Sequence, residues 1–325
     1  MVKKKKRVWP KILLGLVVVI VVIVGALIWK FNSTVNKVKT VEIDKEDLNI
    51  NEEQLDKYEY SKDIVNIALF GVDSEEGQAG RSDSIMILTV DTIHNKIKLT
   101  SIMRDSYVNI SGRGMDKINH AYAFGKEQLA LQTINENFGL NVKDYALVNF
   151  TSLPEIVDAL NGVDLEIKQD EIEYLNQYID SINALEGTSS AHITTAGTQH
   201  LDGVQTLAYA RIRYTDGGDY VRTERHRTVL TALFKEILDK PTTEYLSMLD
   251  KLLPYVQTSM NSSSILSLAT NTLTAMSSPT IQQERLPLDG YSEGVMIDGI
   301  YYLSFDIDYT KEKFMDYIFN DIPME

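Results

Sequence analysis

The fold is decided by three apolar runs that follow one another closely: IVNIALF at residues 64–70, SIMILTVD at residues 84–91 and KIKLTSIM at residues 96–103. Each run is short and rich in β-branched residues, and the first ends at Gly71, which is typical of buried strands. Four residues, Thr92–Asn95, separate the second run from the third, so we expect a hairpin there.

Helix-like and strand-like segments alternate along the rest of the chain. Helices are predicted at residues 121–138, 152–160, 169–185, 223–240, 263–276 and 311–319, and strands at residues 145–150, 163–167, 207–214, 280–286 and 299–305. Gly139 and Pro241 directly follow two of these helices, at positions where helices commonly end. Mixed helices and strands in one compact unit predict an α/β domain.

An uncharged run of 18 residues, Ile12–Trp29, precedes this domain. As a helix rising about 1.5 Å per residue it would extend roughly 27 Å, close to the hydrocarbon thickness of a bilayer. Six basic residues lie before the run, so the positive-inside rule predicts a cytoplasmic tail at residues 1–11 and a transmembrane signal anchor at residues 12–29. A cleaved signal peptide is the alternative, but its apolar core usually has about 7–15 residues and ends at small ones.

The chain beyond the predicted anchor divides into two parts. Residues 30–62 are polar and acidic with weak hydrophobic periodicity, and we interpret them as an extracellular stalk. Residues 63–325 hold the predicted strands and helices and are interpreted as the extracellular catalytic domain. The predicted location is therefore the cell membrane, crossed once, with the domain outside.

Charge and composition exclude several classes of function. The chain has 32 basic and 46 acidic residues, and seven of the basic ones lie in residues 1–30, so the rest is strongly acidic. An acidic body repels phosphate backbones, so nucleic acid is not an expected partner. There are no cysteines, which excludes disulfides, Cys-ligated zinc and thiol catalysis. No G-x-S-x-G elbow, P-loop or dinucleotide fingerprint supports a serine hydrolase or nucleotide-binding enzyme.

Basic side chains concentrate in one short stretch. Five of the ten arginines lie within 17 residues: Arg211, Arg213, Arg222, Arg225 and Arg227. In the predicted strand 207–214, the two-residue period puts Arg211 and Arg213 on one face. Arg222, Arg225 and His226 have the i, i+3, i+4 spacing of one helix face, in the predicted first turn of the next helix.

This arrangement favours an anion site. Cations at a helix N-terminus oppose the helix dipole, which costs stability unless an anion binds there. Converging guanidinium groups and a helix N-terminus are suited to a phosphate or pyrophosphate. The alternative is a solvated basic face that Glu224 and other local carboxylates neutralise.

Carboxylates gather at the ends of the first strands. Asp73 follows the first strand, and Arg81 and Asp83 precede the second, so neighbouring strands would bring both carboxylates to one sheet edge. Two carboxylates beside phosphate-binding arginines suggest a hard divalent ion such as Mg2+, held by few protein ligands. The alternative is that both are turn or cap residues, a common role of Asp. Arg104, at the end of the third strand, adds a guanidinium near the same edge.

Eight short motifs occur in this order: NIALFGVD (66–73), RSDS (81–84), LTSIMRDSY (99–107), KINHAY (117–122), GVD (162–164), LDG (201–203), LAYARIRY (207–214) and GDYVRTERHR (218–227). Behind a single predicted anchor, they resemble the LytR-CpsA-Psr family of Gram-positive cell-envelope proteins. Each motif alone is weak, but eight in one order are specific. They extend from about Asp63 to Lys240.

The resemblance implies a mixed central β-sheet flanked by helices, with a hydrophobic groove for a polyprenyl chain. It implies a phosphotransferase that moves a glycan-1-phosphate, from wall teichoic acid, capsule or a related polymer, from a polyprenyl-pyrophosphate carrier to peptidoglycan. The implied partners are the lipid-linked glycan, peptidoglycan and the membrane of a Gram-positive cell.

The resemblance also implies roles for individual residues. Asp73 and Asp83 would hold Mg2+ (or Mn2+). The pyrophosphate would contact Arg81, Arg104, Arg211, Arg213, Arg222, Arg225 and His226. Catalysis would rest on Asp83, Arg104, Arg211 and Asp219, the last as an orienting carboxylate. The chain departs from the family pattern at His226, commonly Gln, and at Met103, where a Pro usually precedes the Arg-Asp pair.

Two other functions remain open at this point. The same residues would serve a polyprenyl-pyrophosphate hydrolase, with water as the acceptor. A non-catalytic regulator that binds envelope lipids is the third possibility, although an eleven-residue cytoplasmic tail is too short for a DNA-binding domain. For the transferase, the general base is one of Asp83, Asp105 and Asp219, and the residues alone do not choose among them.

Overall fold

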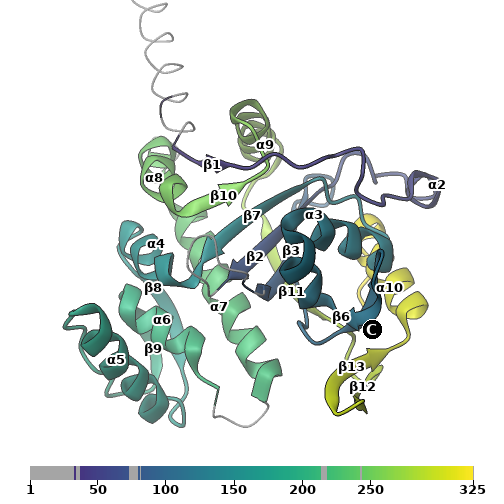
Figure 1. The fold of residues 1–325 in the computed structure, drawn as a ribbon. Helices are drawn as coiled ribbons and strands as arrows, with labels where there is room; N and C mark the ends of the chain where they lie inside the picture. Colours follow the sequence, from purple (N-terminus) through teal and green to yellow (C-terminus); the bar gives the residue numbers. More distant parts are fainter. Residues whose placement is uncertain are drawn as a thin grey trace, which may run out of the picture.

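The computed structural model describes residue 33 and residues 37–72, 80, 82–213, 218–241 and 244–324. These residues form a central seven-stranded β-sheet in the order β1-β10-β7-β2-β3-β4-β11 (Figure 1). Its strands are β1 (Lys39–Thr40), β10 (Val256–Thr258), β7 (Asp144–Asn149), β2 (Val65–Val72), β3 (Ser82–Asp91), β4 (Lys96–Ile102) and β11 (Thr280–Leu286). β2, β3 and β4 are antiparallel neighbours, while β7 and β11 run parallel to β2 and β4. The predicted hairpin and the mixed sheet are confirmed.

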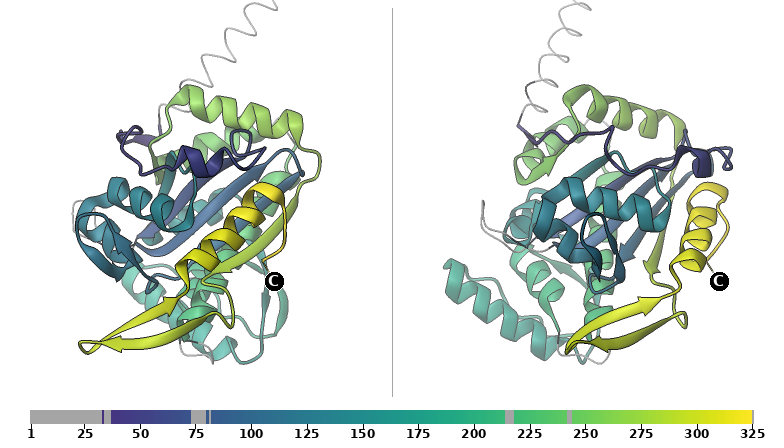
Figure 2. Two further views of the ribbon diagram at one scale, coloured as in Figure 1. Left: turned by 90° about the vertical axis from the view of Figure 1, so that its right-hand side faces the viewer. Right: turned by 45° about the vertical axis from the view of Figure 1, so that its right-hand side comes forward.

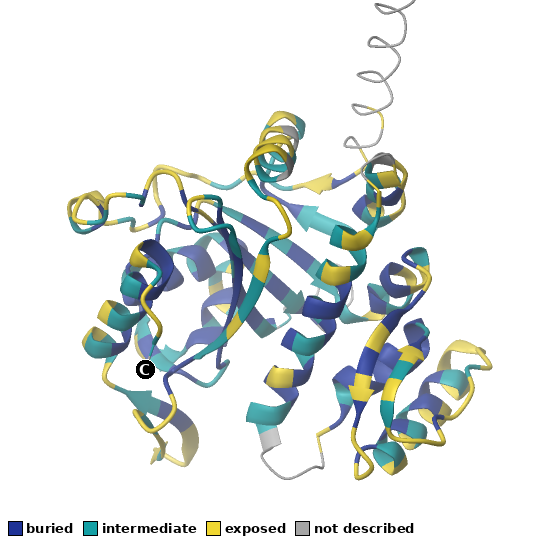
Figure 3. Ribbon diagram, turned by 180° about the vertical axis from the view of Figure 1, so that it is seen from behind, coloured by how far each residue is buried: buried dark blue, intermediate teal, exposed yellow. Residues whose placement is uncertain are grey.

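Helices cover both faces of the sheet (Figures 1 and 3). One face carries α3 (Ile118–Phe138) and α10 (Ile307–Asn320), and the other carries α7 (Gly218–Asp239), α4 (Leu153–Ala159) and α8 (Tyr245–Leu252). Side chains of β2 alternate between them: Phe70 packs in a core with Phe138 and Phe314, while Leu69 faces the side of α7. The predicted α/β fold with helices flanking a mixed sheet is confirmed.

A second hydrophobic core lies beside the sheet, between a lobe of two strands and two helices and the helices α4, α7 and α8. The lobe comprises β8 (Val163–Ile167), α5 (Ile172–Glu186), β9 (Gly197–Leu201) and α6 (Gly203–Arg211). The remaining elements are α2 (Glu52–Leu55), η1 (Phe150–Ser152), η3 (Leu253–Tyr255), α9 (Ser262–Ala275) and the hairpins β5 (Tyr107–Ile110)–β6 (Gly114–Lys117) and β12 (Ser292–Ile297)–β13 (Ile300–Phe305). Figure 2 shows the β12–β13 hairpin projecting from the body of the molecule.

The predicted strand at residues 207–214 is wrong, because residues 207–211 belong to helix α6, which ends at Arg211. Asp202 and Gln205 form a reciprocal capping box at its start. Every residue from Gly203 to Ala210 is buried, so no polar side marks a helical period in the sequence. The argument that placed Arg211 and Arg213 on one strand face is therefore wrong as well.

Residues 37–62 pack on the domain instead of forming a separate stalk. β1 pairs with β10, and the side chains of Leu48 and Leu55 are 1% and 2% exposed within the main core. The described domain therefore begins near residue 37, before the predicted boundary at residue 63. The predicted tail and anchor, residues 1–29, lie outside the described residues. Among the residues that are described, no helix has the length and apolar character needed to cross a bilayer.

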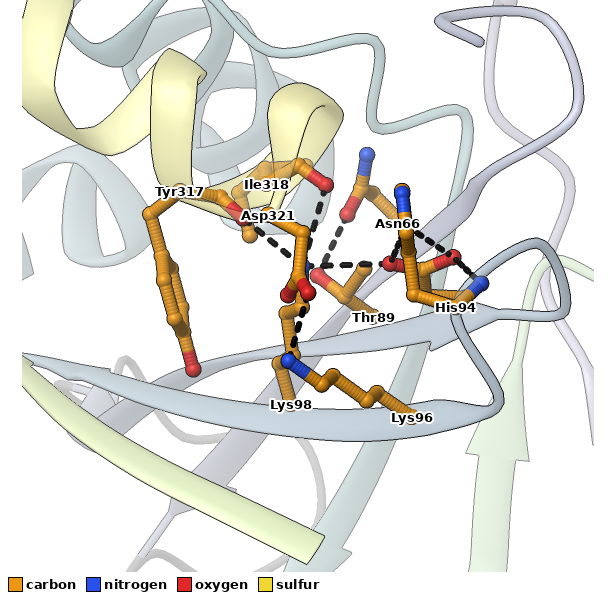
Figure 4. A network of polar contacts seen from close by, with 9 residues as sticks. Asn66, Thr89, His94, Lys96, Lys98, Tyr317, Ile318 and Asp321 are labelled. Atoms are coloured by element: carbon orange, nitrogen blue, oxygen red, sulfur yellow. Dashed lines mark hydrogen bonds and ion pairs between the residues drawn. The ribbon is translucent and has the colours of Figure 1, made fainter. Parts of the chain in front are cut away.

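A buried lysine fixes α10 to the sheet (Figure 4). The Lys98 ammonium, fully buried on β4, donates hydrogen bonds to the carbonyl oxygens of Tyr317 at 2.7 Å and Ile318 at 3.3 Å. It also lies 3.1 Å from Asp91 Oδ2 and 3.0 Å from Asp321 Oδ1. Two carboxylates and two carbonyls thus compensate the buried charge.

The same cluster has the composition of a metal site. Ligand atoms of Asp91, His94 and Asp321 lie within 4.8 Å of one another. The Lys98 ammonium already contacts both carboxylates, so a cation is in place and a metal ion would be repelled. We assign this cluster a structural role.

Candidate functional site

Arg104 is the centre of a charged cluster at the ends of β3, β4 and α7. Its Nη1 lies 2.7 Å from Asp83 Oδ1, at the start of β3, and its Nε lies 3.4 Å from Asp219 Oδ2 in the first turn of α7. Asp105 is 3.7 Å away. Burial would lower the pKa of Arg104, but these carboxylates outweigh it and raise the pKa above its ordinary value. The structure thus brings Asp83 and Arg104 to one sheet edge, as predicted, and Asp219 joins them from α7.

Arg222 completes this cluster from the next turn of α7. Its side chain is 3% exposed, and Nη2 lies 2.6 Å from Asp219 Oδ1 in an ion pair. The contact lacks the geometry of a hydrogen bond, so Nε and Nη2 have no hydrogen-bond acceptor among the described residues. Burial lowers the pKa of Arg222, and the charges of Arg104 and Arg213 lower it further. A buried guanidinium with cationic neighbours is suited to binding an anion.

A small cavity of about 30 Å³ brings the predicted residues together. Its lining residues are Asp83, Phe150, Ala210, Arg211, Arg213, Arg222 and His226. Arg211, Arg213 and Arg222 surround it. Arg211 reaches it from the end of helix α6, where a strand was predicted. We call this cavity the arginine pocket.

An apolar groove of about 290 Å³ lies against the arginine pocket. The sheet contributes side chains such as Leu69 and Met86, and α7 contributes others such as Leu230 and Phe234. Phe150, Ala210 and His226 line both the groove and the arginine pocket. An apolar groove that ends at guanidinium groups fits a ligand with a hydrocarbon chain and an anionic head.

His226 stands between the groove and the pocket. Its ring lies 5.0 Å from the Phe150 ring. Burial of the imidazole lowers the pKa of His226 to about 3, and the charge of Arg222 acts in the same direction. The side chain is therefore neutral at pH 7, so it offers a hydrogen bond to a head group and no positive charge.

The structure does not bring Arg225 into the arginine pocket. Its guanidinium contacts Glu171 Oε1 at 3.1 Å from Nε and 2.9 Å from Nη2, and Nη1 donates to the Ile212 carbonyl at 3.1 Å. Both side chains of this pair are almost fully buried, at 2% and 3% exposed. The predicted pyrophosphate contact of Arg225 is therefore wrong. The guanidinium of Arg225 instead forms a buried ion pair that links α7 to the lobe containing α5.

Two predicted residues, Asp73 and Arg81, lie outside the described residues, so their roles stay predictions. Helix α7 begins at Gly218, earlier than expected, and this places Arg222 and His226 beyond its first turn. Anion binding at this site therefore depends on guanidinium groups more than on the helix terminus.

Phe150 and Lys117 are site residues that the sequence pattern does not single out. Phe150 lines both cavities, and Lys117 Nζ lies 2.7 Å from Asp105 Oδ1. The signal for Lys117 was its place at the start of the KINHAY motif. Phe150 ends the predicted strand 145–150 and carries no pattern that separates it from core residues.

Known proteins match this chain over most of its length. The model of the LytR_cpsA_psr family matches residues 26–315. The polyisoprenyl-teichoic acid--peptidoglycan teichoic acid transferase TagU of Oceanobacillus iheyensis is 32% identical over 310 residues, covering 92% of this chain and 90% of that protein. TagU of Enterococcus faecalis is 30% identical over 315 residues, covering 93% of each.

Solved structures agree with these relatives. TagT bound to LIIa-WTA matches with a TM-score of 0.63 and 25% identity, covering 80% of this chain and 93% of that one. The fold is also that of the family protein YwtF (TagT) with bound octaprenyl pyrophosphate lipid, with a TM-score of 0.62 and 23% identity over 86% of this chain and 99% of that one. The predicted resemblance is confirmed, and the chain belongs to the LytR-CpsA-Psr family.

Proposed function

We propose that this protein is a phosphotransferase that moves a glycan-1-phosphate from a polyprenyl-pyrophosphate carrier to peptidoglycan during cell-wall assembly. The observation that carries the proposal is the continuity of the apolar groove with the arginine pocket through Phe150, Ala210 and His226. A polyprenyl pyrophosphate has the matching division into a hydrocarbon chain and an anionic head. The TagU relatives are named as teichoic acid transferases, which favours teichoic acid as the polymer.

The groove and the arginine pocket would have different roles in this reaction. The polyprenyl chain would lie in the apolar groove, with the pyrophosphate against Arg211, Arg213 and Arg222. A peptidoglycan hydroxyl would attack the sugar-linked phosphorus and form a new P–O bond. The bond from this phosphorus to the bridging oxygen breaks, and polyprenyl phosphate leaves with that oxygen and the electron pair. The arginines stabilise the charge that develops on this leaving group.

The attacking hydroxyl must also lose a proton to a base. Asp83, Asp105 and Asp219 all lie near Arg104, within 4 Å of its guanidinium nitrogens. Any of the three carboxylates can accept the proton in this arrangement.

The carboxylates also fit a divalent cation, which we propose to be Mg2+ (or Mn2+). Asp83 lines the arginine pocket, and Asp219 Oδ2 is buried with no hydrogen-bond donor among the residues described. Carboxylate oxygens are the ligands that Mg2+ prefers, and it commonly uses few of them together with substrate phosphates. Asp83, with Asp73 as the predicted second ligand, would hold the ion. Such an ion neutralises charge on the transferred phosphate.

The predicted anchor at residues 12–29 would hold the domain at the outer face of the cell membrane. Lipid-linked donor and peptidoglycan acceptor both meet at that face. We therefore propose the membrane as a partner of this chain.

The test uses the full-length protein in detergent micelles with Mg2+, a synthetic polyprenyl-pyrophosphate glycan and uncrosslinked peptidoglycan. Mass spectrometry follows phosphodiester-linked glycan. Arg211→Ala should abolish the product because it removes a pocket guanidinium. Arg113→Ala is the matched control, since Arg113 is exposed and stacks on Phe124 away from the pocket, 3.7 Å from the ring centre. Free glycan phosphate would instead establish the hydrolase, and bound but unchanged donor the lipid-binding regulator.

A further inference from the structure

A second set of polar groups without partners lies on another face of α7. The Arg227 side chain is 8% exposed, and its Nε and Nη1 have no hydrogen-bond acceptor among the described residues. Thr231 follows four positions later on the same face, and its buried Oγ1 also lacks a partner in the described part of the chain. Arg222 and His226 point to a different side of the helix, toward the arginine pocket.

Two more polar side chains without hydrogen-bond partners lie on β4 and β11, the strands that face this side of α7. Arg285 on β11 and Ser101 on β4 are partners in the parallel register, so their side chains are on the same sheet face. Arg285 Nε and Ser101 Oγ are buried without a hydrogen-bond partner among the residues described. The Arg285 guanidinium lies over the Tyr220 ring of α7, 4.4 Å from its centre. Helix and strand edge are therefore in contact here.

Nearby carboxylates do not fully neutralise the charges of Arg227 and Arg285. Within the described chain no carboxylate lies within ion-pair distance of Arg227, although Glu224 and Glu284 are near enough to act on it electrostatically. Arg285 pairs through Nη2 with Asp289, whose side chain is 87% exposed. Burial lowers the pKa of Arg227, and the charge of Arg285 lowers it further. A buried guanidinium and a partly buried one, near enough for their charges to repel, are stabilised by a shared anion.

We propose that Arg227, Arg285, Thr231 and Ser101 form a second oxyanion site that binds a phosphate group of the donor glycopolymer. Two guanidinium groups and two hydroxyls offer more donors than one carboxylate can accept, whereas the oxygens of a phosphate accept from several directions. The Arg285 side chain is 17% exposed, which leaves the site open to solvent on that side.

The position of this site suits a polymer held in the arginine pocket. Tyr220, which contacts Arg285, follows Asp219, which contacts Arg104 and Arg222. The two sites therefore lie on opposite flanks of the same turns of α7. Assigning the phosphate to the donor polymer rests on the proposed function, whereas phosphate binding itself does not.

The first experiment measures phosphate binding by thermal unfolding of the full-length protein in micelles. Inorganic phosphate is compared with sodium chloride at equal ionic strength, in an Arg211→Gln/Arg222→Gln background that weakens the arginine pocket. Phosphate should still raise the unfolding midpoint. Adding Arg227→Gln should remove that rise, and Arg285→Gln should reduce it. Lys235→Gln, an exposed lysine on the same helix, should leave it unchanged.

The second experiment measures transfer by the otherwise wild-type protein with two synthetic donors. One donor carries a neutral disaccharide on the polyprenyl pyrophosphate, and the other carries the same disaccharide extended by a polyol phosphate. Arg227→Gln should raise KM about tenfold for the phosphate-bearing donor and leave kcat and the neutral donor unchanged, because losing one hydrogen bond to a charged group weakens binding by about that factor. Arg227→Lys should restore part of the difference.

Each result decides the proposal. The site is overturned if phosphate still raises the unfolding midpoint in the Arg227→Gln protein. It is also overturned if phosphate and sodium chloride have the same effect, which would mean an adventitious ion only. If Arg227→Gln raises KM equally for both donors, the assignment to the polymer is overturned. If the same substitution also removes the effect of inorganic phosphate on the unfolding midpoint, the site binds free phosphate. If the wild-type protein turns over neither donor, the proposed function fails, and the unfolding experiment still decides the second site.

Discussion

At the scale of single residues, Arg222 and Arg225 are three positions apart on α7 but have different partners. Arg222 lines the arginine pocket, whereas Arg225 is paired with Glu171 in a buried contact. Arg222→Gln should lower the transfer rate about a hundredfold with little loss of stability. Arg225→Gln should cost about 3–5 kcal/mol of unfolding free energy, because it leaves the Glu171 carboxylate buried without its partner.

Mass-spectrometric transfer assays and urea unfolding of both variants separate these effects. Arg225→Gln combined with Glu171→Gln serves as the control, since removing both charges should recover part of the stability. An Arg225→Gln protein of wild-type stability with reduced donor binding would return Arg225 to the pyrophosphate contacts.

The sequence could predict Arg211, Arg213, Arg222 and His226 as neighbours because their spacing is short. It could not assign Arg225, because Glu171, the buried carboxylate that holds its guanidinium, is 54 positions away in the sequence and is brought near only by tertiary packing. Helix α7 begins at Gly218, and the predicted start at residue 223 missed its first turn.

At the scale of elements, α10 depends on the buried ion cluster around Lys98. Burial would raise the pKa of Asp321, but hydrogen bonds from Lys96 and Lys98 lower it below its ordinary value. A carboxylate with a depressed folded-state pKa contributes stability above its unfolded pKa, about 3.9, and that contribution is lost as pH falls through the folded value. Wild-type stability should therefore drop below about pH 4 more than that of Asp321→Asn.

Urea unfolding at pH 3 to 7 measures this difference. Asp289→Asn is the matched control, because its carboxylate is exposed and its loss should leave the pH dependence nearly unchanged. A gap between wild type and Asp321→Asn that stays constant down to pH 3 would show that Asp321 is not charged in the cluster.

The elements differ in how well their sequences reveal them. The runs of β2, β3 and β4 are apolar and bounded by turn residues, so they were predicted nearly to the residue. Helix α6 is buried on all sides and has small residues such as Ala208 and Ala210, so its sequence lacks the polar face that identifies a helix. Gly203 allows its close packing, because a Cβ there would lie 2.3 Å from the Pro154 carbonyl oxygen.

At the scale of the whole molecule, the segment at residues 37–62 belongs to the folded unit. A fragment of residues 63–325 should be less stable than one of residues 37–325, because it loses the buried side chains of Leu48 and Leu55 and the β1–β10 pairing. Each buried leucine lost from a core costs about 2–5 kcal/mol. Urea unfolding of both fragments tests this, and equal midpoints would restore the interpretation of a separate stalk.

The boundary was missed because the buried residues of this segment are few and widely spaced. Leu48 and Leu55 stand among acidic and polar residues, and their contacts with the core are made by tertiary packing that no local period records.

The apolar groove has a consequence for turnover. In the proposed reaction the spent carrier, polyprenyl phosphate, retains the whole hydrocarbon chain and loses only the sugar-bearing phosphate. The groove cannot distinguish donor from spent carrier, so preference between them rests on groups outside it: the sugar-bearing phosphate in the arginine pocket and the polymer phosphate at the second oxyanion site. Spent lipid that accumulates in the membrane therefore competes with the donor for the groove and slows turnover. Enzymes that remove or recycle polyprenyl phosphate in the membrane would thereby control the rate of wall decoration.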